Sequence, residues 1–225
     1  MWKLIKWVLS SLLFLVLVLA GLGFYVWHGI YQEPAFYREL AITPETREFA
    51  ELNSGLMSAK ISRCDKAMQR KGSWEIELTQ NELNHWLAIE IDEKRPGAIS
   101  RRIQGVRCQL VADVVRIGAR VDVDEFQGVV SVDVVPTVEA PNVLVMELRR
   151  IRVGTIPLPR KRLLTLLEEK ARELSIPFEC LESNGNPSIR IAFSDGELRR
   201  GYHSLVLHKI LLGAESVSVA GETLE

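Results

Sequence analysis

Cysteine, aromatic residues and net charge are all scarce in this 225-residue chain. The three cysteines, Cys64, Cys108 and Cys180, lie far apart, and no CxxC or Cys/His spacing suggests a zinc site. An exported domain could join one pair in a disulfide, but three buried thiols fit the isolated positions better. With 28 Lys and Arg against 29 Asp and Glu, the formal net charge is -1. Nucleic acid is therefore not an expected partner, because proteins that bind it carry a basic face.

Motifs of enzyme active sites are also missing from the sequence. There is no GxSxG nucleophile elbow and no glycine-rich phosphate loop. His203 and His208 are five residues apart and would face opposite sides of a strand, so they cannot share a ligand. The carboxylates of residues 113–133 fit the solvated face and turns of a sheet better than a metal site. We therefore predict that the protein is not an enzyme, with no catalytic, metal-binding or cofactor-binding residue and no cofactor.

What the chain does contain is a long apolar run near its N-terminus. Residues 7–27 carry no charge, and about 20 apolar residues are enough for a helix to cross a bilayer. Lys3 and Lys6 precede the run, and no Lys or Arg follows it until Arg38. The positive-inside rule then places the N-terminus in the cytoplasm and the rest of the chain outside. The run predicts a single-pass membrane protein that contacts the lipid bilayer through residues 7–27.

A cleaved signal peptide is the alternative interpretation of the same run. Val18 and Ala20 would suit a cleavage site, but the apolar run continues past Ala20, which favours an uncleaved signal-anchor. We expect residues 1–30 to form a cytoplasmic tail and transmembrane anchor. Residues 31–43 would be a juxtamembrane connector, and residues 44–225 an extracytoplasmic α+β domain.

Helix and strand signals alternate after the connector. Thr43 before a proline predicts the start of a helix that runs to about Arg70. Alternating apolar residues predict a short strand at 74–78, and Thr79 with Glu82 forms a capping box that starts another helix. The apolar residues that recur at helical spacing in the first helix are Phe49, Leu52, Leu56, Cys64 and Ala67.

A β-meander is predicted between residues 103 and 153. Apolar residues alternate with polar ones there, which predicts four antiparallel strands with one buried face. Turn-rich stretches at 124–128 and 136–142 separate the later strands. The apolar phase shifts before Ile151, so we expect a β-bulge near Arg149 or Arg150.

An amphipathic helix is predicted after Pro159. Its polar arc carries three positive and three negative charges, whereas a helix on a membrane surface would be rich in Lys and Arg. We therefore expect the apolar side of residues 159–177 to pack on the protein's own sheet. Beyond this helix we expect three strands, the last two forming a hairpin around Gly213. The predicted fold class is α+β: an N-terminal transmembrane helix, then a twisted antiparallel β-meander with long helices packed on one face.

Two segments, EPAFYRELAITPETREFAELNSGLMS and RKGSWEIELTQNELNHWLAIEI, resemble uncharacterised single-anchor exported bacterial proteins of the kind abundant in planctomycetes. The segment LRRIRVGTIPLPRKRLLTLL is similar to small extracytoplasmic domains that resemble one half of a tubular lipid-binding module. The first resemblance implies no activity. The second implies a curved antiparallel sheet with long helices, and neither one assigns a functional residue.

The function we expect is a membrane-anchored extracytoplasmic binding module, non-catalytic, for lipid or another apolar ligand. Valine-rich strands facing leucine-rich helices can enclose a groove, but the same pattern also makes a dry core. The alternative is a protein-interaction or assembly factor of the cell envelope, which an exposed apolar patch would favour. The residues expected to line an apolar groove are Leu83, Trp86, Leu163, Leu164, Leu167 and Ala171.

Overall fold

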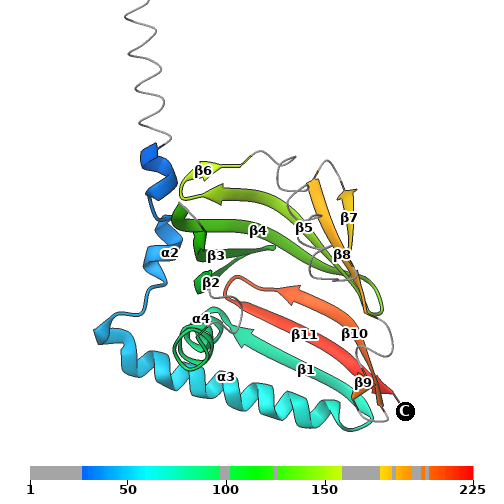
Figure 1. Ribbon diagram of the computed structural model, residues 1–225. Helices are drawn as coiled ribbons and strands as arrows, with labels where there is room; N and C mark the ends of the chain where they lie inside the picture. Colours follow the sequence, from blue (N-terminus) through cyan, green and yellow to red (C-terminus); the bar gives the residue numbers. More distant parts are fainter. Residues whose placement is uncertain are drawn as a thin grey trace, which may run out of the picture.

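The computed structural model describes residues 27–96, 102–123, 126–158, 178–183, 186–193, 199–200 and 203–224. These residues build two antiparallel sheets, a large one of seven strands and a small one of four (Figure 1). The large sheet arches over the small sheet, and a long helix runs below the small sheet (Figure 1).

The large sheet has the strand order β2-β3-β4-β5-β8-β7, and β6 pairs with β5. The predicted meander is confirmed as its first four strands, because β2, β3, β4 and β5 follow one another in both sequence and space. The strands are β2 (Ile103–Val111), β3 (Val114–Val123), β4 (Phe126–Ala140), β5 (Val143–Val153), β6 (Ile156–Pro157), β7 (Phe178–Ser183) and β8 (Asn186–Ala192).

The small sheet joins the strand after the long helix to the end of the chain, in the order β1-β11-β10-β9. Its last two long strands form the hairpin that was predicted around Gly213, where the nitrogen of Gly213 donates to the oxygen of Ser216 at 2.7 Å. The strands are β1 (Gly72–Thr79), β9 (Arg199–Arg200), β10 (His203–Leu212) and β11 (Ser216–Leu224).

The helices lie early in the described chain. The helix predicted from Thr43 is confirmed. Thr43 is the N-cap of a short 3-10 turn, and the α-helix that follows has Thr46 as its N-cap. The capping box of Thr79 and Glu82 is also confirmed, and the helix that it starts continues as a π-helix. The elements are α2 (Ala35–Glu39), η1 (Pro44–Thr46), α3 (Arg47–Met68), α4 (Gln80–Trp86) and η2 (Leu87–Glu93).

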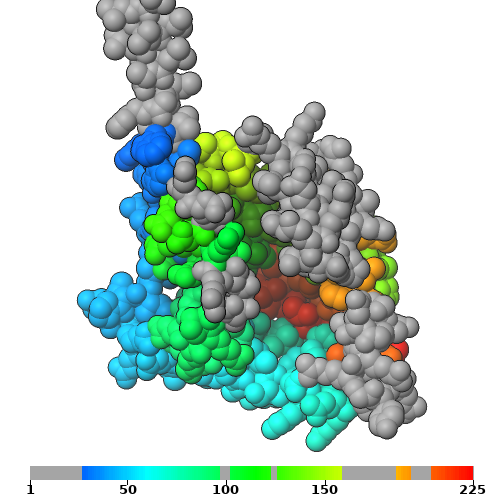
Figure 2. Space-filling view, viewed as in Figure 1, coloured from blue at the N-terminus to red at the C-terminus, as the bar shows by residue number. Residues whose placement is uncertain are grey.

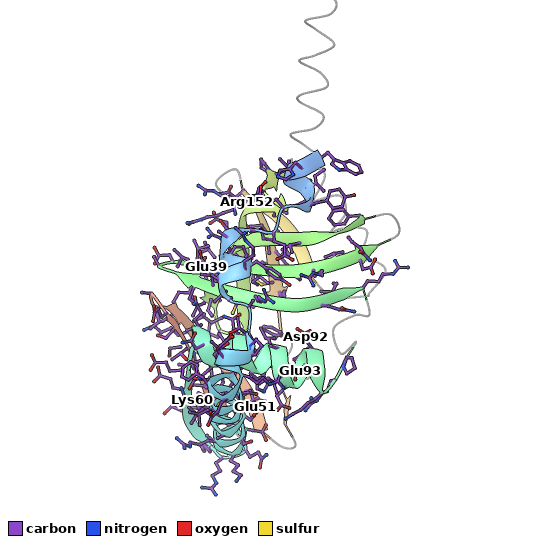
Figure 3. All side chains as sticks on the ribbon, turned by 90° about the vertical axis from the view of Figure 1, so that its left-hand side faces the viewer. Glu39, Glu51, Lys60, Asp92, Glu93 and Arg152 are labelled. Atoms are coloured by element: carbon purple, nitrogen blue, oxygen red, sulfur yellow. The ribbon has the colours of Figure 1, made fainter. Side chains whose placement is uncertain are left out.

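Helix α2 covers the outer face of the large sheet. Phe36 and Tyr37 are buried with Val129 of β4, and Figure 3 shows α2 lying across the strands. A Cβ at Gly118 of β3 would lie 2.8 Å from the ring of Phe36, so the sheet needs a glycine where the rings approach it. The hydroxyl of Tyr37 donates to the backbone oxygen of Gly105 at 2.6 Å. These contacts leave the opposite face of the sheet turned toward the small sheet.

The β-bulge predicted near Arg149 or Arg150 is confirmed. Asp133 pairs with Arg150 and Val134 with Leu148, so Arg149 is the extra residue in β5. The predicted turn at 136–142 is shorter than expected, because β4 continues to Ala140. The pairing of β3 with β4 ends at Val115 and Val134, so Pro136 lies where β4 has no described partner strand on that side, a position at which a strand tolerates proline.

Two asparagine side chains bind strand backbones where the two sheets meet. On one side, Asn84 of α4 accepts from the nitrogen of Cys108 at 2.8 Å and donates to its oxygen at 2.6 Å. On the other side, Asn142, in the turn between β4 and β5, accepts at Oδ1 from the nitrogen of Leu207 at 2.7 Å. Its own backbone nitrogen donates to the oxygen of Leu207 at 3.1 Å. Each asparagine thus takes the place of a neighbouring strand at a free edge.

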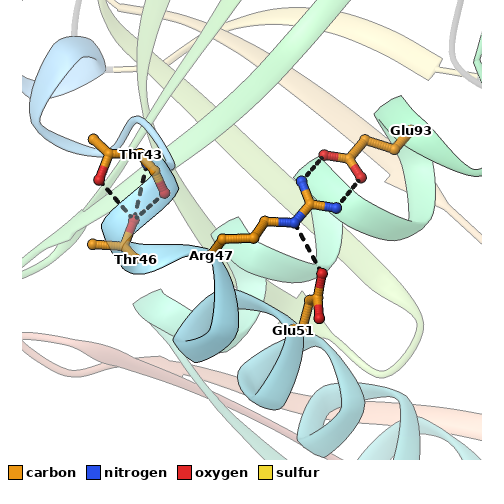
Figure 4. A network of polar contacts seen from close by, with 5 residues as sticks. All are labelled: Thr43, Thr46, Arg47, Glu51 and Glu93. Carbon is orange, nitrogen blue, oxygen red and sulfur yellow. Dashed lines mark hydrogen bonds and ion pairs between the residues drawn. The ribbon is translucent and has the colours of Figure 1, made fainter.

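Helix α3 is fastened to the π-helix by one arginine. Arg47 donates through both terminal nitrogens to Glu93, at 2.6 and 2.7 Å, and through Nε to Glu51 at 2.9 Å (Figure 4). The guanidinium of Arg47 holds the pKa of Glu93 below its usual range, because its hydrogen bonds favour the charged carboxylate. This bidentate contact fixes the start of α3 against η2.

The predicted fold class needs correction. The described residues are mostly antiparallel β-sheet. We expected long helices to cover one face of a single sheet, but the described strands form two sheets. Strands β1, β10 and β11 pair with one another in a second sheet, and α3 lies along β1. The pairing of β1 with β11 joins segments more than a hundred residues apart, which alternation of residue types does not encode. The amphipathic helix predicted at 159–177 lies outside the described residues.

The predicted transmembrane helix and the single-pass localisation also need correction. In the described ranges, no helix combines the length and the apolar character that crossing a bilayer requires. Helix α3, with 22 residues, is long enough, but charged side chains are spread along it, including Arg47, Glu51, Lys60 and Lys66. Residues 7–26 of the predicted span lie outside the described part of the chain.

Candidate functional site

The candidate site is the apolar face of the large sheet, on the side opposite α2. Alternate residues of each strand point to this face, as their period of two requires. Three side chains on it are buried: Val134, Leu148 and Ile151. The side chains packed around them are only half-buried, and they are Ile117, Val132, Met146, Leu158 and Ile189.

Incomplete burial continues along the same face beyond this cluster. Val115, Ala119 and Val121 of β3 and Val130 of β4 are half-buried too. Side chains of these types are among those most often fully enclosed in a protein interior. An apolar face of this breadth therefore keeps contact area that its described neighbours do not cover.

The shape of the molecule places a hollow next to this face. Figure 2 shows the surface recessed between the strands of the large sheet above and β1 below, with β10 and β11 at the back of the recess. β-bulges help the sheet to curve, since each one bends its strand. The register shifts between Gln104 and Arg107 in β2 and at Arg149 in β5.

A second concave feature is polar. A cavity of about 430 Å³ opens where α3, the end of β1, the start of α4 and the β10–β11 turn meet. Its lining residues are Asn53, Glu77, Thr79, Gln80, Asn81, Glu215 and Ser216. The amide of Asn53 donates to the backbone oxygen of Phe49 at 2.8 Å, and Oε1 of Gln80 accepts from the nitrogen of Leu110 at 2.7 Å. An apolar ligand does not suit this lining, because it would leave the polar groups without partners.

The predicted groove residues are only partly within the described chain. Leu83 and Trp86 are half-buried on α4, which packs against β2 at one border of the large sheet. Neither of them belongs to the cluster around Leu148. Leu163, Leu164, Leu167 and Ala171 lie outside the described residues, so the six-residue groove stays a prediction.

Titratable side chains do not gather into a reactive cluster in the described part of the chain. No group of three or more His, Cys, Asp or Glu residues there is placed to hold a metal ion. His85 is half-buried against the ring of Phe49, and burial lowers its pKa. Cys64 and Cys108 are buried, as expected, and burial raises the pKa of the Cys108 thiol to about 11. A thiol with that pKa is a poor nucleophile at neutral pH.

Sequence patterns missed the polar cavity entirely. Asn53 lies on α3, Gln80 on α4 and Glu215 in the last hairpin, so only tertiary folding brings them together. The roles of Asn84 and Asn142 were missed for the same reason. A weak signal existed for Asn142, because it follows a proline and asparagine tolerates the positive φ of 63° that it adopts.

Comparisons with protein-family models, with curated proteins and with solved structures give no match. The resemblance to planctomycete-type exported proteins and to tubular lipid-binding domains therefore stays a prediction.

Proposed function

We propose that this chain is a non-catalytic binding module for a lipid or another apolar small molecule, held against the apolar face of the large sheet. The observation that carries the proposal is the half-burial of Ile117, Val132, Met146 and Ile189 on a curved sheet beside a hollow. An apolar ligand that covered these side chains would remove their exposed area from water, at about 25 cal/mol per Å².

The direct test is binding of a fluorescent fatty acid to the full chain. An NBD-labelled fatty acid should give a saturable rise in fluorescence, and organic extraction of protein purified without delipidation should release an apolar compound. Ala119→Phe places a ring on the apolar face without adding charge. Because the ring occupies contact area that the ligand needs, we expect affinity to fall about tenfold, which corresponds to about 1.4 kcal/mol.

The matched control is Ala59→Phe, which adds the same ring at an exposed position of α3. It should leave fatty-acid affinity unchanged. The proposal is overturned if the wild-type chain shows no saturable signal and releases no apolar compound. It is also overturned if both substitutions weaken binding equally.

A further inference from the structure

Helix α3 exposes a stripe of large apolar side chains. Phe49, Leu52 and Leu56 have relative exposures of 51%, 62% and 49%, and their spacing places them on one side of the helix. The side of α3 that is buried carries other residues: Ala50, Asn53, Ser54, Met57 and Cys64. We call the exposed set the α3 stripe. The ring of Phe49 meets the ring of His85 edge to face, with centroids 5.6 Å apart, so the stripe adjoins α4.

The α3 stripe and the polar cavity share helix α3. Asn53, which lines the cavity, follows Leu52 in the sequence and lies one turn from Leu56. Glu77 and Glu215 contribute two exposed carboxylates, and none of the described lining residues is basic. The nearby Lys60 donates to Glu82 at 2.8 Å and to the backbone oxygen of Glu77 at 2.9 Å. The charge of Lys60 is therefore directed at Glu82. The carboxylates of Glu77 and Glu215 in the cavity favour a positively charged group on a ligand.

Two ion pairs hold the stripe in place. Arg47 binds Glu93 just before Phe49, and Lys60 binds the buried carboxylate of Glu82 one turn after Leu56. Figure 3 shows Lys60 and Glu51 on α3, below Glu93 and Asp92 of η2. A surface that is already ordered loses little conformational entropy when a partner binds.

We infer that the α3 stripe and the cavity together form a docking site for a basic amphipathic segment of a partner protein. Its apolar side chains would cover Phe49, Leu52 and Leu56, and a Lys or Arg beside them would reach Glu77 and Glu215. Helices bind grooves of this kind through anchors at i, i+3, i+4 and i+7. A lipid chain would leave the carboxylates unpaired, and coverage by a second copy of this chain is an outcome that the test below distinguishes.

Labelled peptides test this inference on the full chain. The probe is a fluorescein-labelled amphipathic peptide of about 16 residues, roughly four helical turns, built from Leu and Lys. Matched peptides carry Gln or Glu at the Lys positions. In fluorescence polarisation the Lys peptide should bind at least about tenfold more tightly than the Glu peptide. Leu52→Ser and Leu56→Ser should each weaken the Lys and Gln peptides, since both peptides keep the apolar contacts.

Charge and position are tested separately. Glu77→Gln combined with Glu215→Gln should weaken the Lys peptide about tenfold and leave the Gln peptide unchanged. Leu211→Ser is the matched control, because Leu211 is 48% exposed but lies on β10. It should change no affinity. All these positions are exposed, so the unfolding midpoints should stay near the wild-type value.

Three results overturn the inference. In the first result, the Lys and Glu peptides bind with the same affinity. In the second, Leu211→Ser weakens peptide binding as much as Leu52→Ser does. In the third result, sedimentation shows a dimer that Leu56→Ser converts to monomer, which means that a second copy covers the stripe. Ala119→Phe, which tests the apolar face of the large sheet, should not affect peptide binding, so each proposal can fail without the other.

Discussion

Replacement of Asn84 by alanine should strongly destabilise the protein, because this one side chain closes the free edge of β2. Its amide satisfies both the N–H and the C=O of Cys108, at 2.8 and 2.6 Å. Asn84 is 4% exposed and Cys108 is 7% exposed, so water has little access to the groups that the substitution would leave unpaired. The same helix also supplies Gln80, whose Oε1 accepts from the nitrogen of Leu110.

The size of the effect follows from these two backbone groups. Each buried group left without a partner costs about 1–3 kcal/mol, so the pair costs about 2–6 kcal/mol. Alanine favours the helix over asparagine by roughly 0.5 kcal/mol, which offsets a small part of the loss. We therefore expect the free energy of unfolding to fall by about 2–5 kcal/mol, a large share of the roughly 5–15 kcal/mol typical of a domain.

The assay is equilibrium unfolding of the full chain in urea, followed by tryptophan fluorescence and by circular dichroism. Asn81→Ala on the same helix is the control, since Asn81 is exposed and the change should stay within about 0.5 kcal/mol. Asn84→Asp keeps the shape but turns an acceptor toward the oxygen of Cys108, and it should destabilise at least as much at neutral pH. A loss below about 1 kcal/mol for Asn84→Ala would refute the reasoning.

Four further predictions concern packing, pH and reactivity. Gly118→Ala, whose Cβ would lie 2.8 Å from a ring of α2, should lower stability by about 1–3 kcal/mol. Gly55→Ala in α3, where an added Cβ would meet nothing within 4 Å, should raise stability by about 0.5–1 kcal/mol. Urea unfolding measures both changes, and a more stable Gly118→Ala or a less stable Gly55→Ala would contradict the respective prediction. Burial raises the pKa of Glu82, but hydrogen bonds from Lys60 and a backbone N–H outweigh it and hold the pKa below its usual value. The charged carboxylate therefore stabilises the fold above its unfolded-state pKa, and this contribution is lost as the pH falls through the folded-state pKa. Glu82→Gln should destabilise the protein at about pH 7 and make little difference at about pH 2, and an equal loss at both would count against this assignment. The Cys108 thiol, with its pKa raised to about 11, should react with a maleimide at neutral pH only after unfolding, as peptide mass spectrometry can show; equal labelling of the folded chain would contradict its burial.

Local signals in the sequence were reliable where neighbours along the chain decide the structure. The capping box of Thr79 and Glu82, the helix after Thr43 and the bulge at Arg149 were all predicted, because each depends on residues within a few positions. The limit of such signals shows at α3. Its large apolar residues Phe49 and Leu52 recur at helical spacing but are exposed. Small residues such as Ala50 and Ser54 are buried instead, because they allow close approach of neighbouring elements.

Contacts between distant segments decided the features of the fold that sequence patterns did not predict. Alternation identified β1, β10 and β11 as strands, but hydrogen bonds between residues 72–79 and 216–223 made them a second sheet. The predicted membrane-spanning helix and single-pass localisation find no support in the described residues. The helical pattern of α3 did not show that its stripe stays uncovered, since periodicity reports which residues share a face and not what lies against that face.

The sequence by itself determined which residues share a face of β1, β3, β4 and β5 and where the helices after Thr43 and Thr79 begin. Those properties follow from backbone geometry and from side chains within one or two turns. The tertiary structure alone decided that Asn84 and Asn142 bind the edges of strands from distant segments. It also decided that Asn53, Glu77 and Glu215 share one cavity. The asparagine contacts and the shared cavity both depend on tertiary folding that brings distant segments of the chain together. Local preferences of the chain do not encode which distant segments meet.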